Sequence, residues 1–244
     1  MQYTNIGENI FLVHKEKGMS SFQLVQQFKR FIGAQKAGHA GTLDPLASGM
    51  MIIGIERGTK QMHALVGEDK VYITDVVLGE SRTTGDTEGK VLEHKCYEGD
   101  IEKEDVENAL QSLLGEHFFD APLYSAVKVE GKPLYWYARN GKQPPFFPQK
   151  RMLLKDFKIL DMYKRNRGKQ FVIRLRLRVG SGTYIRTLAE VLGKKLGYPA
   201  HISYLYRFCI GTYCANLLPQ KKENSFLKKC AILGKDIIRF FKKN

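Results

Sequence analysis

The stretch Gly38-His39-Ala40-Gly41-Thr42-Leu43-Asp44-Pro45-Leu46-Ala47-Ser48-Gly49 contains the strongest local structural signals in this chain. Its glycines can adopt backbone angles that other residues avoid, and Pro45 keeps Asp44 out of the helical region. The stretch therefore predicts an irregular loop that carries Asp44. A carboxylate on a stiff loop between ordered elements suits a nucleophile or a general acid/base. An Asp-Pro pair can also simply begin a turn, so the loop by itself leaves both interpretations open.

Ordered elements are predicted on both sides of this loop. On its N-terminal side, Ser20 or Ser21 can cap a helix that runs to Ile32 and ends at Gly33. The predicted apolar face of that helix consists of Phe22, Val25, Phe28 and Ile32. On the C-terminal side, the apolar run 50–55 predicts a buried strand. We expect the loop to lie between a packed helix and a central strand.

The remaining chain alternates between strand and helix patterns. Hydrophobic periodicity predicts strands over 10–13, 71–78, 124–129, 171–179 and 201–210 and helices over 102–114 and 183–196. Ser181 and Thr183 are the candidate caps of the second helix. The strand over 171–179 is apolar on one face and carries Arg174, Arg176 and Arg178 on the other. That basic face is interpreted either as a solvated outer surface or as a surface that faces RNA.

The charge of the chain points to an anionic partner. The chain has 244 residues, a net charge of +14 and a pI near 9.5. Its length allows one large domain or two small ones. A field of this sign attracts polyanions, nucleic acid first and an anionic membrane surface second. Charge does not separate these two partners, nor does it distinguish an enzyme from a passive binding protein.

The cysteines and histidines give no metal-site pattern. The four cysteines include no Cys-x-x-Cys pair, and the six histidines are scattered singly. We therefore expect neither a zinc site nor a disulfide, and we expect mostly buried free thiols. No apolar run reaches the length of roughly 18 to 20 residues that a bilayer span needs, and no signal-type segment opens the chain. The expected location is the cytoplasm.

The loop closely resembles the catalytic loop of the TruB family of tRNA pseudouridine synthases. In that family the loop reads Gly-His-Thr-Gly-Thr-Leu-Asp-Pro-Leu-Ala-Thr-Gly, so only Ala40 and Ser48 depart from it. Four further blocks resemble the family in the same order: Lys70-Val71-Tyr72, Ala121-Pro122-Leu123-Tyr124-Ser125-Ala126-Val127-Lys128, Gly182-Thr183-Tyr184-Ile185-Arg186-Thr187 and Ala200-His201-Ile202-Ser203-Tyr204-Leu205. The resemblance covers the chain from about residue 10 to about residue 213.

The resemblance implies a fold and an activity. The implied fold is α+β, with a central, mostly antiparallel mixed sheet, helices around it and a catalytic cleft. The implied activity is the isomerisation of uridine 55 in the T loop of tRNA to pseudouridine, with the target base flipped out. This chemistry needs no redox step, cofactor or metal. The implied partner is the T arm of tRNA, and we expect a monomer that requires no protein partner and no membrane.

The resemblance also implies three catalytic residues. Asp44 matches the nucleophile, which attacks the sugar C1′ or the base C6; the sequence leaves both sites of attack open. Arg186 matches the arginine that pairs with this aspartate and keeps it ionised. Tyr72 matches the tyrosine that stacks on the target base and is a candidate for the proton transfers. Without the family, the favoured interpretation of Tyr72 is a core tyrosine on a strand, and Arg186 is a helical arginine of the kind that most often lies at the surface.

Further residues match substrate contacts of the family. Tyr184 and Leu205 match residues that line the uracil pocket, although both also suit a packed core. His39 matches the histidine that contacts the T loop beside the flipped nucleotide. The chain departs from the family at Glu16, where proline is usual, and at Arg82-Thr83-Thr84, where Thr-Asp-Thr is usual. It also has Leu205-Tyr206-Arg207 in place of Leu-Arg-Arg, which removes one expected phosphate contact.

The end of the chain differs in character from the core. We predict a catalytic domain over 1–215 and a short, lysine-rich extension over 216–244 that contacts phosphates. Most bacterial relatives carry a PUA-type RNA-binding domain after the core, so the resemblance suggests a short form without it. Two alternatives stay open: a TruB-like enzyme that acts on another RNA, with or without a guide RNA, and a basic RNA-binding or chaperone protein without catalysis. A hydrolase with paired carboxylates lacks a convincing second acid.

Overall fold

A computed structural model describes residues 1–98, 101–166 and 169–218. The chain divides into two compact units. Among the described residues, the first unit comprises 1–68 together with 207–218, and the second comprises residues from 69 to 206. The predicted boundary at residue 215 stays a prediction. Most of the predicted extension, from residue 219 on, lies outside the described residues.

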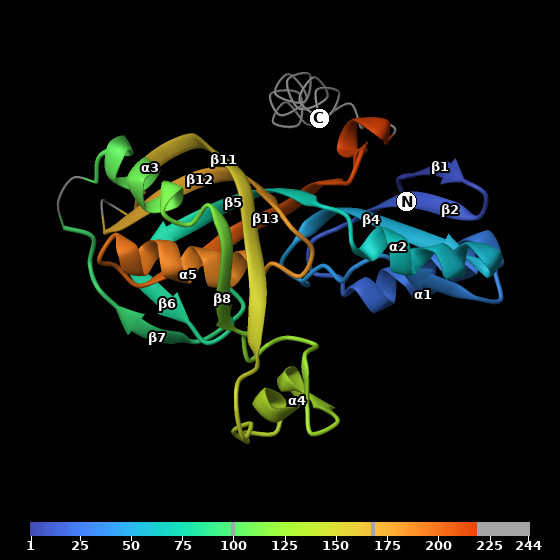
Figure 1. Cartoon of the computed structure of the whole chain (residues 1–244), viewed down its shortest axis with the longest axis horizontal. Coiled ribbons are helices and arrows are strands. Elements are labelled where there is room, and N and C mark those ends of the chain that lie inside the picture. The colour runs from blue at the N-terminus through green and yellow to red at the C-terminus, as the bar shows by residue number, and fades with distance from the viewer. Residues whose placement is uncertain (99–100, 167–168, 219–244) are drawn as a thin grey trace. The chain divides into compact units, whose positions relative to one another are not determined.

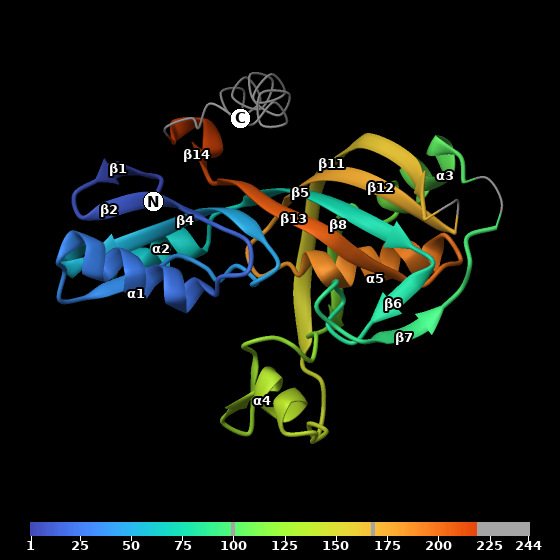
Figure 2. The same ribbon diagram turned by 180° about the vertical axis from the view of Figure 1, so that it is seen from behind.

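The first unit is a small antiparallel sheet with one long helix. Its elements are β1 (Tyr3–Gly7), β2 (Ile10–Lys15), α1 (Ser21–Ile32), β3 (Ala37–His39), β4 (Ser48–Ile55), the 3-10 helix η1 (Glu56–Gln61), α2 (Met62–Val66), β14 (Tyr213–Cys214) and the 3-10 helix η2 (Ala215–Leu217). The strands β1, β2 and β4 follow one another in the sheet, and β3 pairs with β4. Both views show α1 alongside β2 and β4 (Figure 1; Figure 2). The buried strand predicted over 50–55 is confirmed as β4.

Helix α1 begins and ends where the sequence predicts. Ser20 caps it through a capping box with Gln23, and Gly33 ends it in the left-handed conformation at φ 74°. The buried residues are Ser21, Leu24, Val25 and Phe28, whereas Phe22 is 69% exposed. The predicted apolar face was therefore wrong at Phe22. The face is set by the aromatic rings of the sheet, because Phe28 packs edge-on against Phe11 and Tyr3 at 5.2 and 5.5 Å between ring centres.

The second unit is a larger antiparallel sheet with helices. Its elements are β5 (Lys70–Leu78), β6 (Glu80–Arg82), β7 (Val91–His94), α3 (Lys103–Gln111), β8 (Gly115–Asp120), β9 (Lys128–Val129), β10 (Lys132–Pro133), α4 (Leu134–Arg139), β11 (Gln149–Arg165), β12 (Gln170–Val179), α5 (Ile185–Lys195) and the part of β13 (Ala200–Ile210) that precedes Arg207. The strand order is β13-β5-β12-β11-β8. The α+β class and the mostly antiparallel sheet are confirmed.

The core of the second unit lies between its sheet and two helices. Helices α3 and α5 lie beside this sheet (Figure 1). Apolar side chains of β5, β11 and β12 meet those of the two helices and of the residues next to them. They are Val76, Leu110, Leu113, Leu154, Leu175, Leu177, Ile185, Leu188, Ala189 and Leu192. This packing fixes α5 on the sheet and thereby fixes the residues at its N-terminus.

The basic face of β12 is occupied by ion pairs. Arg174 binds Asp75 through two hydrogen bonds of 2.6 and 2.7 Å, Arg176 pairs with Asp156, and Arg178 pairs with Asp69 at 3.0 Å. The carboxylates come from the neighbouring strands and from the residue before β5. The three arginines are half-buried and bound to these carboxylates, so they do not form a solvated face. Their charges are matched within the unit, an arrangement that neither sequence interpretation anticipated.

The strand predicted over 124–129 was mostly wrong, because only Lys128–Val129 forms a strand. The preceding backbone has other partners. The carbonyl oxygens of Ser125 and Val127 accept from the first amides of α4, those of Tyr135 and Leu134. These two carbonyl oxygens accept from amides that have no partner within the helix, and they are therefore not available for pairing in a sheet.

The prediction that no disulfide forms was also wrong. Cys209 and Cys214 are joined across the antiparallel pair of β13 and β14, where they stand opposite each other with Cα atoms 4.1 Å apart. Cys96 is free, and it is exposed rather than buried; Cys230 lies outside the described residues. Within the described ranges no group of three His, Cys, Asp or Glu side chains is placed to hold a metal ion, and no helix there could span a bilayer.

Candidate active site

Asp44 lies on an irregular loop, as the sequence predicts. The loop joins β3 to β4, two strands that pair antiparallel with His39 opposite Ile53. Gly41 and Gly49 near its two ends have φ values of 100° and 116°, which favour glycine strongly. Asp44 itself is half-buried. The hairpin thus holds the carboxylate at a partly open position between two ordered strands.

Helix α1 fixes the residue before Asp44. The hydroxyl of Ser21 donates to the carbonyl oxygen of Leu43 and accepts from the amide of Leu43, both at 2.8 Å. Ser21 and Leu43 are both buried. A buried pair of hydrogen bonds between a helix and one backbone unit leaves that unit little freedom. The sequence indicates Ser21 only as a possible helix cap and gives no sign of this contact.

A buried lysine fixes the residue after Asp44. The Nζ atom of Lys15 donates to the carbonyl oxygens of Met19 at 2.6 Å, Glu16 at 3.1 Å and Pro45 at 3.4 Å. Pro45 also accepts from the amide of Gly18 at 2.8 Å. The side chain of Lys15 is fully buried. Sequence reasoning missed Lys15. Glu16, which departs from the family proline, still supplies a carbonyl to this cluster.

His39 stands at the end of β3, next to the loop. Burial lowers the pKa of the His39 imidazole, and the positive charge of Arg207 lowers it further, while a backbone hydrogen bond at Gly41 opposes the shift. The ring is therefore neutral at pH 7. A neutral imidazole can stack on or hydrogen-bond to a base without adding charge.

Tyr72 and Leu205 lie on neighbouring strands of the second unit. Tyr72 is in β5 opposite Leu177 of β12, and Leu205 is in β13, the strand on the other side of β5. The hydroxyl of Thr74 donates to the carbonyl oxygen of Tyr204 at 2.8 Å, which ties these two strands together. Both Tyr72 and Leu205 are buried.

Arg186 is buried at the start of α5, with 4% of its surface exposed. Its guanidinium donates to the carbonyl oxygens of Thr84 at 2.7 Å and Tyr124 at 3.0 Å. Arg186 is therefore not at the surface, where a helical arginine most often lies.

The N-terminus of α5 is not capped by a side chain. Its N-cap residue, Tyr184, is half-buried and makes no side-chain cap bond, so the predicted caps Ser181 and Thr183 were wrong. The hydroxyl of Thr183 instead accepts from the amide of Leu153 at 3.0 Å.

A turn rich in small residues covers Arg186. Gly85 has φ 73°, and a Cβ atom there would lie 2.7 Å from Oε1 of Glu190 and 3.1 Å from Cβ of Arg186. The positive φ and the close approach to Cβ of Arg186 therefore favour glycine at this position. Thr84, the last residue of the Arg82-Thr83-Thr84 block, binds Arg186 through its backbone carbonyl and not through its side chain.

The structure groups the predicted site residues by unit. His39 and Asp44 belong to the first unit, and Tyr72, Tyr184, Arg186 and Leu205 belong to the second. Within the first unit, the loop with Asp44 is held by Ser21 and Lys15. Within the second, Tyr72 and Leu205 share a sheet, while Arg186 is anchored on backbone carbonyls.

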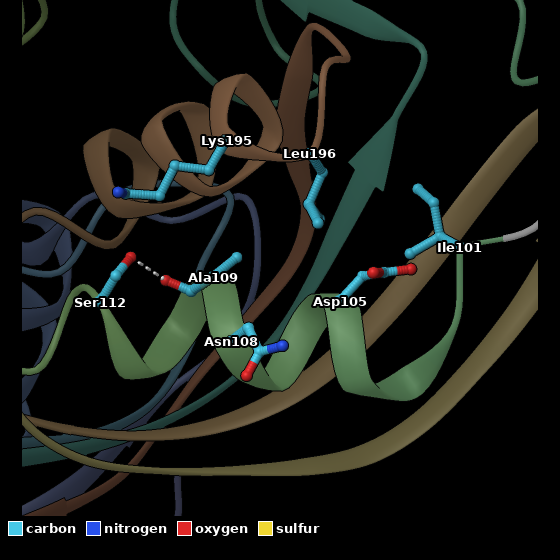
Figure 3. A pocket seen from close by; sticks show the side chains of 7 residues that line it. All are labelled: Ile101, Asp105, Asn108, Ala109, Ser112, Lys195 and Leu196. Atoms are coloured by element: carbon cyan, nitrogen blue, oxygen red, sulfur yellow. Dashed lines mark hydrogen bonds between the residues drawn. The ribbon is translucent and has the colours of Figure 1, made fainter.

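A groove of about 450 Å³ in the second unit contains none of these residues. It lies between α3 and α5 (Figure 3) and is lined by Ile101, Asp105, Asn108, Ala109, Ser112, Lys195 and Leu196. Two of its polar groups serve helix ends: Asp105 accepts from the amide of Glu102 at 3.0 Å, and Ser112 donates to the carbonyl oxygen of Ala109 at 2.8 Å. The groove therefore gives no sign of a catalytic centre.

Comparison with known proteins places the chain in a family. Residues 29–185 match the family described as TruB family pseudouridylate synthase (N terminal domain). The chain is 40% identical over 204 residues to tRNA pseudouridine synthase B of Bacillus subtilis (strain 168), which covers 84% of this chain and 65% of that protein. It is 38% identical over 206 residues to tRNA pseudouridine synthase B of Geobacillus kaustophilus (strain HTA426), covering 84% and 72%.

A solved structure agrees with these matches. The crystal structure of a Cbf5-Nop10-Gar1 complex contains a chain with a TM-score of 0.63 and 25% identity to this one, over 84% of this chain and 50% of the other. The chain thus spans about two thirds of the length of its sequence relatives and half of this structural relative. On the family match and the sequence identities together, this chain belongs to the TruB family of pseudouridylate synthases.

Proposed function

We propose that this protein is a tRNA pseudouridine synthase that converts uridine 55 in the T loop of tRNA into pseudouridine. The observation that carries the proposal is the half-buried Asp44 on a loop whose neighbouring backbone is fixed by Ser21 and Lys15. Two of its relatives bear the name tRNA pseudouridine synthase B, which supports pseudouridine formation in tRNA as the activity. A carboxylate held in place by its neighbours is what a nucleophilic step needs, because the geometry is prepared before the substrate arrives.

The reaction rearranges bonds without oxidation. The bond between N1 of uracil and C1′ of ribose breaks, the base turns, and a bond forms between C5 and C1′. The proton on C5 leaves, and N1 gains one. In the proposed mechanism Asp44 is the nucleophile, at C1′ or at C6, and Arg186 is the cation that keeps the carboxylate ionised. No step calls for a metal or a cofactor.

The remaining predicted residues bind the base and its loop. We assign Tyr72 as the ring that stacks on the flipped uracil and as a candidate for the proton transfers. Tyr184 and Leu205 would line the pocket of the detached base. The burial of Tyr72 and Leu205 supports this, because a dry pocket holds a loose base better than an open one. The neutral His39 would contact the T loop beside the vacated position.

A surface of the second unit also suits RNA. On and around α4, Nζ of Lys132 lies 4.1 Å from the ring centre of Trp136, and the guanidinium of Arg139 lies 5.3 Å from that of Tyr135. Tyr135 is exposed. Aromatic rings interleaved with cations offer stacking and charge together, the combination by which proteins bind single-stranded loops. The net charge of +14 acts in the same direction.

We infer further that the protein works as a monomer on the T arm in the cytoplasm, where tRNA is available, without a protein partner or a membrane. The similar solved structure is that of a Cbf5-Nop10-Gar1 complex, but that assembly is a property of that protein. Size-exclusion chromatography with light scattering, alone and with a T-arm RNA, tests the oligomeric state.

The decisive experiment is the mapping of pseudouridine in a T-arm RNA after incubation with the purified protein in the presence of EDTA. We expect one modified nucleotide, at the position of uridine 55. An RNA with cytidine at that position is the matched control and should remain unmodified. Absence of pseudouridine in the first RNA, with binding intact, would favour a non-catalytic RNA-binding protein, and modification elsewhere would favour another RNA substrate.

A further inference from the structure

Arg207 holds both arms of the loop that carries Asp44. Its guanidinium donates from Nη2 to the carbonyl oxygen of Gly41 at 3.2 Å and from Nη1 to that of Thr42 at 3.1 Å. It also donates from Nε to the carbonyl oxygen of Met50 at 2.7 Å. Gly41 and Thr42 precede Asp44, and Met50 follows it in β4. A single planar group therefore sets the spacing between the two arms.

Two glycines of the motif allow this contact. A Cβ atom on Gly49 would lie 2.7 Å from the backbone nitrogen of Arg207, so only glycine lets the backbone of β13 come this close. Gly41 has φ 100°, which turns its carbonyl oxygen into the guanidinium without a strained side chain. Both glycines thus serve the approach of Arg207 to the loop.

Burying the charge of Arg207 costs free energy, so the contacts that satisfy this guanidinium indicate its role. Arg207 is 1% exposed, and a cation removed from water is destabilising unless its donors are satisfied. Three carbonyl oxygens satisfy it here. Arg207 is the last position of the Leu-Arg-Arg pattern of the family, where an arginine suggests phosphate binding. Its guanidinium is buried in this structure and is therefore not available to RNA. Its partner is the backbone of the loop.

We propose that Arg207 is a positioning residue for Asp44: it keeps the two arms of the loop at the separation that aims the carboxylate. The inference rests on the proposed function, since it takes Asp44 as the reacting group. Arg207 acts through the loop and not on the RNA, so its loss should lower kcat and leave KM nearly unchanged. A misplacement of roughly 1 Å at a reacting group costs about 100-fold in rate.

The test compares Arg207→Ala and Arg207→Lys with the unchanged protein in steady-state pseudouridine formation on a T-arm RNA. We expect kcat of Arg207→Ala to fall about 100-fold with a similar KM. Guanidinium ion at low millimolar concentration should restore part of the lost kcat, because it can enter the vacated space and bridge the same carbonyls. Arg207→Lys should also lose kcat, because one ammonium cannot contact both arms, and guanidinium should not restore it.

Arg174→Ala is the matched control. It removes a different guanidinium, which is half-buried and bound to Asp75. Arg174 is far from the loop in sequence and belongs to the other unit. It should lower stability without lowering kcat and without rescue. If Arg207→Ala does not fold, Arg207→Lys decides the question by the same comparison of kcat and KM.

A kcat close to that of the unchanged protein in either folded Arg207 variant, or a loss confined to KM, would overturn the positioning role. An unchanged protein that makes no pseudouridine is a different result, since it refutes the proposed function itself. Amide hydrogen exchange in residues 40–47 provides an independent readout: Arg207→Ala should speed exchange there, and Arg174→Ala should not.

Discussion

Ser21 and Leu43 exchange two hydrogen bonds of 2.8 Å, so one helix hydroxyl satisfies both backbone groups of the residue next to Asp44. Ser21→Ala would leave a buried amide and a buried carbonyl unpaired, each at a cost of about 1–3 kcal/mol. We expect a lower kcat with a similar affinity for T-arm RNA, because the loop loses its support while the RNA contacts remain. Urea unfolding and steady-state kinetics measure the two effects.

The adjacent Ser20 provides a control that also destabilises α1 but does not contact Leu43. Ser20→Ala removes the N-cap bond to Gln23, worth about 1 kcal/mol, at the same end of the same helix. It should lower stability and leave kcat unchanged. Equal losses of kcat in both variants would mean that stability alone, and not the contact with Leu43, governs the activity.

Asp44→Asn and Asp44→Ala should abolish pseudouridine formation and retain binding of T-arm RNA. Neither side chain can act as the nucleophile, whereas the surfaces that bind RNA are untouched. Filter binding and single-turnover mapping of pseudouridine separate the two properties. Asp161→Asn, a change at an exposed carboxylate of β11, should behave like the unchanged protein. Turnover by either Asp44 variant would show that another group carries the reaction.

The local elements of the fold were accessible from sequence because their signals are local. Helix α1 has its cap at Ser20 and its stop at Gly33, and β4 contains the apolar run 50–55. Strand β11 was not predicted, because its residues alternate between buried, half-buried and exposed positions without a regular period. Its conformation comes from pairing with β8 over residues 149–154 and with β12 over residues 154–165. Such pairing is a tertiary property that no short window contains.

The candidate site was also only partly predictable from the sequence. The motif located Asp44, but the residues that hold its loop were missed, because Ser21, Lys15 and Arg207 all bind backbone groups. A sequence does not reveal which carbonyl a side chain will reach. The disulfide was missed for a related reason: Cys209 and Cys214 meet only through the register of β13 and β14. Spacing along the chain gave no hint of it.

Arg186→Lys should reduce activity although it keeps the charge. The guanidinium of Arg186 reaches two carbonyl oxygens, those of Thr84 and Tyr124, and an ammonium cannot reproduce this fork. One buried carbonyl would lose its partner, at a cost of about 1–3 kcal/mol. We expect lower kcat and a lower urea midpoint. Arg151→Lys, at an exposed ion pair with Glu116, should change neither. Full activity of Arg186→Lys would show that only its charge matters.

His201 should make the stability of the protein depend on pH below neutrality. The ring is buried in β13, and its Nδ1 hydrogen-bonds to the carbonyl oxygen of Glu80 at 2.8 Å. Burial lowers its pKa, the hydrogen bond opposes this, and the charge of Arg82 adds to the lowering. The unfolded chain takes up a proton near the ordinary histidine pKa of about 6.5, and the folded protein does so only at lower pH. In that window the unfolded state binds more protons, so the free energy of unfolding falls as the pH falls.

His201→Gln should weaken this dependence, because the amide can still donate to Glu80 but does not titrate. Urea unfolding between pH 5 and pH 7.5 measures it: the free energy of unfolding should fall less steeply on acidification in the variant than in the unchanged protein. His63→Gln, at an exposed histidine of α2, is the control and should leave the slope as it is. His39, whose pKa is lowered as well, will keep part of the slope in place. A slope in His201→Gln as steep as in the unchanged protein would mean that His201 does not contribute, and that His39 or the carboxylates set the acid stability instead.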